Sequence, residues 1–183
     1  MARLSKITGK DQVPPQHQAA VEAIIKSRGA IQGPFTMFLH SPEVAERVAH
    51  LGAYVRFEGS LDFRVRVLAA MAVARELDAM YVWGAQAGQA RKLGVPESTV
   101  AAIRERHTRG MPPDDAEIVD FTRALLTKHR ADDATVAALR KRFGDDQFVQ
   151  LTTAIGYYSL LAMTVNACEL EPAAGADLLM GGP

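Results

Sequence analysis

The sequence of 183 residues predicts an all-α fold. Apolar residues recur at helical spacing along most of the chain, and no segment alternates apolar and polar residues over a convincing strand length. We find no internal repeat and no low-complexity block. With 48% apolar residues, the chain can bury a core of ordinary size. We therefore expect one domain over residues 1–183, with an extended arm at 1–15 and a loose tail at 173–183.

The first half of the chain predicts four helices. Pro14-Pro15 interrupts the chain before the first helix, which Gly29 ends with a left-handed residue. Ser41-Pro42-Glu43 supplies an N-cap, a proline in the first turn and an early acid for the second helix, and Gly59-Ser60 ends it. Asp78 separates an alanine-rich third helix from the fourth. These helices are predicted at residues 16–28, 42–57, 61–77 and 79–93, with a loop at 30–40.

The second half predicts four more helices. Gly94 ends the preceding helix, and Pro96 opens the next one. The loop Met111-Pro112-Pro113-Asp114 leads into another, and Asp132-Asp133 caps the one after it. Gly144-Asp145-Asp146 then breaks the chain and caps a long last helix. The predicted ranges are residues 96–107, 115–128, 134–143 and 147–170.

Charge and cysteine content argue against several classes of protein. The 21 basic and 21 acidic side chains cancel, so no overall field attracts nucleic acid or an anionic membrane. Cys168 is the only cysteine, which excludes an internal disulfide and a Cys-x-x-Cys pair. The histidines are not spaced as a metal site, and no segment approaches the ~20 uninterrupted apolar residues of a membrane helix. We expect a cytoplasmic protein with no metal, cofactor, nucleic-acid or membrane partner.

The run from Arg64 to Val95, RVRVLAAMAVARELDAMYVWGAQAGQARKLGV, resembles the central motif of the carboxymuconolactone decarboxylase family. That family shares its fold with the AhpD-type alkylhydroperoxidases. Residues 33–43 and 155–166 also resemble its single-domain members, so the resemblance extends over about residues 14–172. It implies an all-helical bundle built around a two-helix hairpin and assembled as a trimer or a dimer of trimers.

The resemblance fails at the reactive positions of the family's redox branch. That branch carries a glutamate on the first motif helix and Cys-x-x-Cys-x-x-x-His on the second, with a glycine eight residues beyond the histidine. Counting back from Gly94 places Val67 at the glutamate, Ala79 and Val82 at the two thiols, and Gln86 at the histidine. Peroxide reduction by this route needs an attacking thiolate, a resolving thiol and a base. We therefore reject a thiol peroxidase.

The non-redox branch commonly shows Tyr-Glu-Trp-x-x-His at the place where this chain has Tyr81-Val82-Trp83-Gly84-Ala85-Gln86. Both aromatic residues are kept, whereas the carboxylate and the imidazole are lost. Gln86 can donate and accept hydrogen bonds but cannot titrate, which suits a group that holds a carboxylate or carbonyl. A bond to a buried backbone group would explain Gln86 equally well, and Trp83 is explained by a place in the core.

Candidates outside this motif have two interpretations each. Arg64 and Arg66 could bind an anionic substrate, although a surface or intersubunit ion pair also explains them. His40 could act as an acid or base if its loop closes the pocket. Tyr158 and Asn166 could face the pocket, or serve in core packing and a bond between helices. The predicted catalytic residues are His40, Tyr81 and Gln86, and the predicted substrate-binding residues are Arg64, Val67, Ala79, Val82, Trp83, Tyr158 and Asn166.

Two functions remain open on the sequence. The first is a cofactor-free lyase or isomerase acting on a small carboxylated lactone or oxo acid, with Arg64 or Gln86 as the anchor and His40 or Tyr81 as the proton donor. The second is a non-catalytic member of the family that keeps the oligomer and an apolar cavity for binding a small molecule or for assembly.

Overall fold

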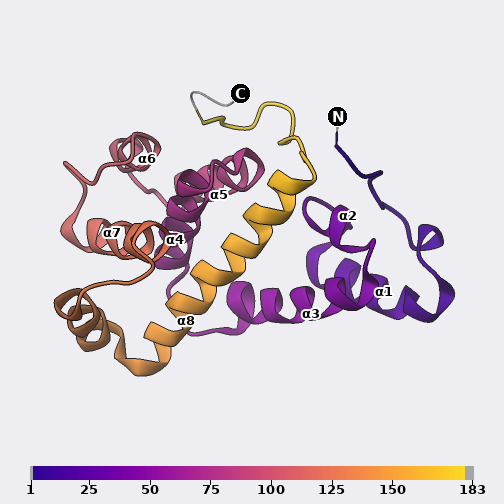
Figure 1. Cartoon of the computed structure of the whole chain (residues 1–183), viewed down its shortest axis with the longest axis horizontal. Helices are drawn as coiled ribbons and strands as arrows, with labels where there is room; N and C mark the ends of the chain where they lie inside the picture. The colour runs from indigo at the N-terminus through magenta and orange to yellow at the C-terminus, as the bar shows by residue number, and fades with distance from the viewer. Residues whose placement is uncertain (1, 180–183) are drawn as a thin grey trace.

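The computed structural model describes residues 2–179 of the chain. These residues form eight α-helices and no strand. The predicted all-α fold is confirmed, and Figure 1 shows the arrangement of the helices. A π-helical turn, η3, covers Tyr54–Glu58, and short 3-10 turns cover Lys10–Gln12 and Pro15–His17. The helices are α1 Gln18–Arg28, α2 Phe35–Phe38, α3 Pro42–Ala53, α4 Phe63–Glu76, α5 Met80–Lys92, α6 Glu97–Arg104, α7 Pro113–Thr127 and α8 Asp133–Ala167.

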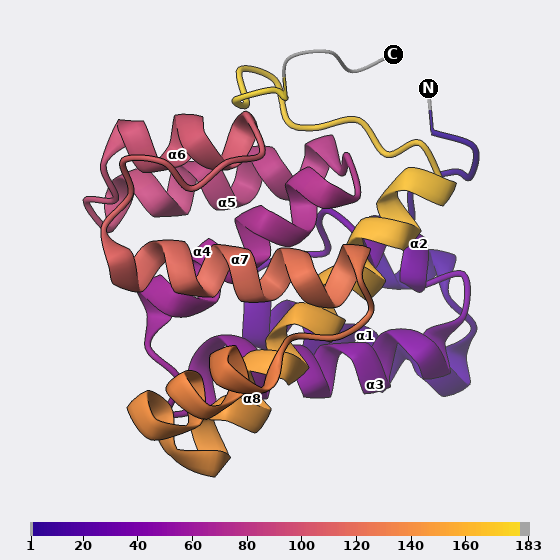
Figure 2. The ribbon, with the colours of Figure 1, turned by 60° about the vertical axis from the view of Figure 1, so that its left-hand side comes forward.

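Helix α4 forms the centre of the core. Every residue from Val65 to Ala74 is buried, and a helix that is buried all round must be covered by other elements on every side. Helices α5, α7 and α8 make its main contacts, and its alanines allow these helices to approach closely. Figure 2 shows α7 passing in front of α4.

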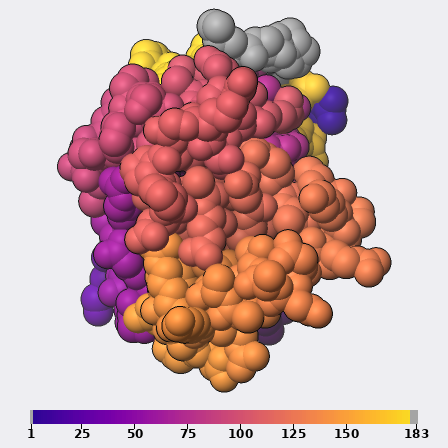
Figure 3. Space-filling model, turned by 90° about the vertical axis from the view of Figure 1, so that its left-hand side faces the viewer, coloured from indigo at the N-terminus to yellow at the C-terminus, as the bar shows by residue number. Residues whose placement is uncertain are grey.

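Helix α8 lies between two groups of helices. Figure 1 shows α4–α7 on one side of it and α1–α3 on the other. The face of the molecule away from α1–α3 is covered mainly by α6, α7 and the first part of α8 (Figure 3). Within α8, Gly144 has φ 73° and ψ 169°, so two helices meet there at a kink, as the sequence predicts.

Helix α8 is long and apolar enough to cross a membrane by length and composition, and it is the only such helix in residues 2–179. Half of its apolar window is buried within the fold. A core helix of a globular protein has the same properties, so this feature is weak evidence for a membrane span.

Two segments are more ordered than the sequence predicts. The predicted loop at 30–40 contains the short helix α2, because Phe35, Met37 and Phe38 turn together into the core. The predicted extended arm is only partly extended, since it contains a 3-10 turn and buries Ile7 and Val13 against its own chain.

The C-terminal segment is also held against the fold as far as residue 179. Asp177 pairs with both Arg91 and Arg104, and Leu179 is buried. The tail that the sequence predicts to be loose therefore packs over α5 where its residues are described. The remainder of the predicted tail, residues 180–183, lies outside the described residues.

Candidate functional site

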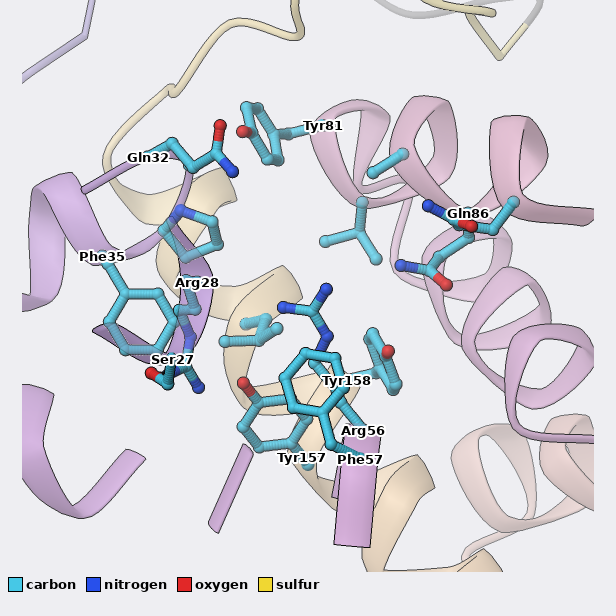
Figure 4. Close-up of a pocket in the computed structure, with 16 residues that line it drawn as sticks. Ser27, Arg28, Gln32, Phe35, Arg56, Phe57, Tyr81, Gln86, Tyr157 and Tyr158 are labelled. Atoms are coloured by element: carbon cyan, nitrogen blue, oxygen red, sulfur yellow. The ribbon is translucent and has the colours of Figure 1, made fainter. Parts of the chain in front are cut away.

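A cleft with two lobes opens between the loop after α1, the turn η3, and helices α5 and α8. The Arg28 lobe has a volume of about 400 Å³ and the Arg66 lobe about 630 Å³, each within the range of small-molecule sites. Figure 4 shows the Arg28 lobe. Both lobes are lined by Arg56, Phe57, Ala85, Gln86, Gln89 and Tyr158.

The π-helical turn η3 supplies the rim shared by the two lobes. Such turns insert one residue into a helix and are frequent at functional sites. Here the turn presents Arg56 and Phe57 to the cleft, with the guanidinium carbon of Arg56 4.9 Å from the centre of the Phe57 ring. Phe57 is 60% exposed, so an apolar ring and a cation both face solvent at the entrance.

The charge of the cleft is entirely positive. Arg28, Arg56 and Arg66 line it, whereas its lining contains no aspartate, glutamate or histidine. No ion pair within residues 2–179 involves any of these three arginines. An anion that entered the cleft would therefore meet guanidinium groups that have no carboxylate partner.

Arg66 is the most deeply buried of the three, at 5% exposed. Its Nη1 donates a hydrogen bond of 3.4 Å to the Tyr158 hydroxyl oxygen, and its guanidinium carbon lies 4.3 Å from the centre of the Phe63 ring. Burial lowers the pKa of Arg66, an effect that the nearby hydroxyl of Tyr158 opposes. Such a lowered pKa is expected when a buried cation has no counter-ion beside it.

Arg28 is held by neutral partners as well. Its guanidinium donates to Ala49 O at 2.9 Å and Ser27 Oγ at 2.7 Å, and also bonds to the Tyr157 hydroxyl. Burial lowers the pKa of Arg28 and raises that of Tyr157. The absence of a side chain at Gly52 is required here, because a Cβ atom would overlap the Tyr157 hydroxyl.

Part of the chain that lines this cleft is similar to a known protein family. Residues 42–108 match the carboxymuconolactone decarboxylase family. This matched segment contains α3 to α6 and η3, and so contributes Arg56, Arg66 and Gln86 to the cleft, whereas Arg28 and Tyr158 come from outside it. A search of curated proteins gives no match.

The chain has an AhpD-like fold over most of its length. A peroxidase-related protein with an alkylhydroperoxidase AhpD core from Ralstonia eutropha JMP134 has a TM-score of 0.77 at 15% identity, over 94% of this chain and 93% of that chain. A peroxidase-related protein from Silicibacter sp. TM1040 has a TM-score of 0.75 at 15% identity, over 96% and 93%. A debrominase in complex with 2,3,4-tribromopyrrole has a TM-score of 0.72 at 16% identity, over 95% of each chain.

Four of the predicted site residues line the cleft. Tyr81 and Val82 line the Arg28 lobe, and Gln86 and Tyr158 line both lobes. Burial raises the pKa of Tyr81. The remaining motif residues that the sequence places at the site, Val67, Ala79 and Trp83, are fully buried and line neither lobe.

Three other predicted residues lie outside the cleft and have partners elsewhere. Arg64 forms an ion pair with Asp115, in which Nη2 and Oδ2 are 2.6 Å apart, so the ion pair is within the chain. The exposed His40 is bonded through Nε2 to Ser5 O at 2.8 Å. Asn166 donates from Nδ2 to Leu77 O at 2.7 Å, a bond between helices that the sequence analysis also considered.

Sequence reasoning missed Arg28, Arg56 and Tyr157, and for Arg66 it left an ion pair open beside an anionic ligand. Tyr157 and Tyr158 both line the Arg28 lobe, although they are about a third of a turn apart on α8. A usable signal was the position of Arg66 within the alanine-rich run of α4, where a charged residue faces the core. Arg28 and Arg56 carry no comparable signal, because their positions at the ends of helices are ordinary for arginine.

Proposed function

We propose that the cleft binds a small carboxylate and that the protein is a cofactor-free lyase or isomerase acting on a carboxylated lactone or oxo acid. The observation that carries this proposal is Arg66, a buried guanidinium whose contacts are a tyrosine hydroxyl and an aromatic ring. Under this proposal the anchor of the carboxylate is Arg66, with Gln86 lining the same lobe, and Arg64 is not required because Asp115 already neutralises it.

The energetics of burial support an anionic ligand. Removing a charged group from water is unfavourable by several kcal/mol unless a counter-charge or hydrogen bonds compensate. Within residues 2–179, Arg28 and Arg66 have hydrogen bonds only to neutral groups, so a carboxylate would supply the missing negative charge. The planar guanidinium also matches the two oxygens of a carboxylate geometrically.

The other lining residues suit decarboxylation or a proton shift. Val82, Ala85 and Leu161 give the Arg28 lobe an apolar wall, which favours the loss of charge as carbon dioxide leaves. Gln86 and Tyr158 can donate hydrogen bonds to an enolate oxygen. The family match of residues 42–108 supports the same class of reaction, and the debrominase complex supports a small planar ligand for this fold.

A non-catalytic protein that binds a small carboxylate is the second candidate. It is favoured by the absence of any carboxylate, imidazole or thiol from the lining of the two lobes. For either candidate we propose a cytoplasmic protein that assembles as a trimer or a dimer of trimers, as its resemblance to the family implies.

The test uses 4-carboxymuconolactone, the compound in the family's name, and 3-oxobutanoate as a simple oxo acid. Binding is measured by isothermal titration calorimetry and turnover by release of carbon dioxide. The proposal predicts that the wild type binds at least one acid and that Arg66→Met weakens binding. Arg47→Met removes an exposed arginine outside the cleft and is the matched control. Binding without turnover would favour the non-catalytic candidate, and no binding of either acid would overturn the proposal.

A further inference from the structure

We propose that Tyr158 is the proton-transfer residue of this cleft and that Arg66 is its positioning residue. This inference rests on the proposed function and names the group that would carry out its chemistry. It differs from the sequence-based expectation, which gave the proton to His40 or Tyr81.

The lining leaves few groups able to transfer a proton. The side chains of the two lobes that carry a titratable group are Arg28, Arg56, Arg66, Tyr81, Tyr157 and Tyr158. An arginine keeps its proton in proteins and cannot act as an acid at neutral pH. Proton transfer by a side chain of this cleft therefore falls to a tyrosine.

The three tyrosines differ in their partners. The Tyr157 hydroxyl bonds to Arg28 and lies against the backbone of α3 at Gly52, so it points away from the junction of the lobes. The Tyr81 hydroxyl packs against Gly33, and burial without a neighbouring cation raises its pKa. Such a phenol holds its proton more tightly than an exposed phenol.

Tyr158 has the position that the other two lack. Its side chain is 3% exposed and borders both lobes, as does Gln86 on the opposite helix α5. Its ring packs edge-on against Tyr157, with ring centres 5.4 Å apart. A ligand in either lobe can therefore contact Tyr158, which is held in place by packing on α8.

Arg66 prepares that hydroxyl for donation. Because Arg66 Nη1 donates to the Tyr158 oxygen, the tyrosine uses a lone pair in this bond and keeps its own O–H free for a ligand. The same guanidinium would stabilise the phenolate left after donation. Phe63 holds the guanidinium from the other side, with 4.3 Å between the guanidinium carbon and the ring centre.

The proposed step is balanced without an oxidant or reductant. The carbon–carbon bond to the substrate carboxylate breaks, carbon dioxide leaves, and the bonding electron pair passes into the adjacent carbonyl system as an enolate. The Tyr158 proton then moves to the enolate carbon, and the phenolate recovers a proton from water. The negative charge thus passes from the carboxylate to the enolate and then to the phenolate beside Arg66.

The experiment compares Tyr158→Phe with wild type in release of carbon dioxide from 4-carboxymuconolactone and in its binding by calorimetry. We expect kcat to fall by about 10²-fold or more, with binding close to wild type, because proton transfer contributes about 10²–10⁴-fold to such reactions. Arg66→Lys keeps the positive charge and should restore part of the kcat that Arg66→Met loses. Tyr54→Phe makes the same change at a tyrosine outside the lining of the cleft and is the control.

The outcomes separate this inference from the function on which it rests. If the wild type neither binds the acid nor releases carbon dioxide, the proposed function and the role of Tyr158 are both refuted. If the wild type binds without turnover, or if Tyr158→Phe keeps its kcat, the proton-transfer role falls and carboxylate binding stands. A parallel loss of binding and kcat in Tyr158→Phe would assign Tyr158 to binding and also overturn the role, as would a larger fall in kcat for Tyr81→Phe. Thermal melts of each variant establish that it is folded.

Discussion

Two arginines of α4, two positions apart in the sequence, should respond in opposite directions to the same substitution. Arg64 and Arg66 are both flanked by apolar residues, but Arg64 is paired with the buried Asp115, whose side chain is 8% exposed. Arg66 is buried and pairs with no carboxylate in residues 2–179. We predict that Arg64→Met destabilises the fold and that Arg66→Met stabilises it.

The magnitudes follow from the groups that each change leaves behind. Arg64→Met leaves the Asp115 carboxylate buried without its guanidinium, and losing hydrogen bonds between charged groups costs about 1.5–3 kcal/mol. Arg66→Met loses a cation–π contact of roughly 0.5–2 kcal/mol and one long hydrogen bond, but removes a desolvation penalty of several kcal/mol. We expect a net gain of about 1 kcal/mol, which raises Tm by roughly 2–4 °C for a domain of this size.

Urea unfolding followed by circular dichroism, together with thermal melts, measures both effects. The dependence of unfolding on urea should keep the same slope in the two variants, so that the midpoint reports stability alone. If Arg66→Met proved as destabilising as Arg64→Met, Arg66 would be a structural residue whose neutral contacts suffice. The burial of Arg66 would then give no indication of a missing anion.

Three further predictions concern the packing around the cleft and the tail. Gly52→Ala places a Cβ atom against the Tyr157 hydroxyl and should lower the unfolding free energy by about 1–3 kcal/mol. Gly88→Ala is the control, because nothing lies near its Cβ atom and it should cause no such loss. Equal losses of stability in the two variants would contradict the packing around Gly52. Burial raises the pKa of Tyr157, so the stability it contributes is present below about pH 10 and is lost as pH rises through the raised value. Unfolding free energies of wild type and Tyr157→Phe should therefore converge in alkaline solution, and a constant difference across that range would refute the sign. Asp177→Asn removes a carboxylate shared by two arginines. Hydrogen exchange should become faster in residues 171–179, while Tm falls only slightly. Unchanged exchange would show that other contacts hold the C-terminal segment.

The fold could be predicted from the sequence because its signals are local. Glycines and prolines mark the ends of the helices, and Gly144 divides the last two predicted helices at the residue where α8 kinks. Caps were less predictable, since Ser41 makes no side-chain bond at the start of α3, whereas Asp62 caps α4 without having been noticed. The helix α2 was missed because four residues are too few to show a period.

The site could be predicted only in part, because it joins segments far apart in the sequence. The α5 residues Tyr81, Val82 and Gln86 were found from one helical motif, and they do line the cleft. Arg28 comes from the end of α1 and Tyr157 from α8, and no periodicity links them. Arg64 and Arg66 look alike in sequence. They are distinguished only by Asp115, about fifty residues later, which pairs with Arg64.

A calorimetric titration of 4-carboxymuconolactone and of its uncharged methyl ester into wild type and Arg66→Met tests whether Arg66 is the carboxylate anchor. We predict that wild type binds the acid in preference to the ester and that Arg66→Met weakens binding of the acid by at least about tenfold, equivalent to about 1.4 kcal/mol. Equal binding of acid and ester, or equal binding by wild type and Arg66→Met, would contradict a carboxylate site built around Arg66.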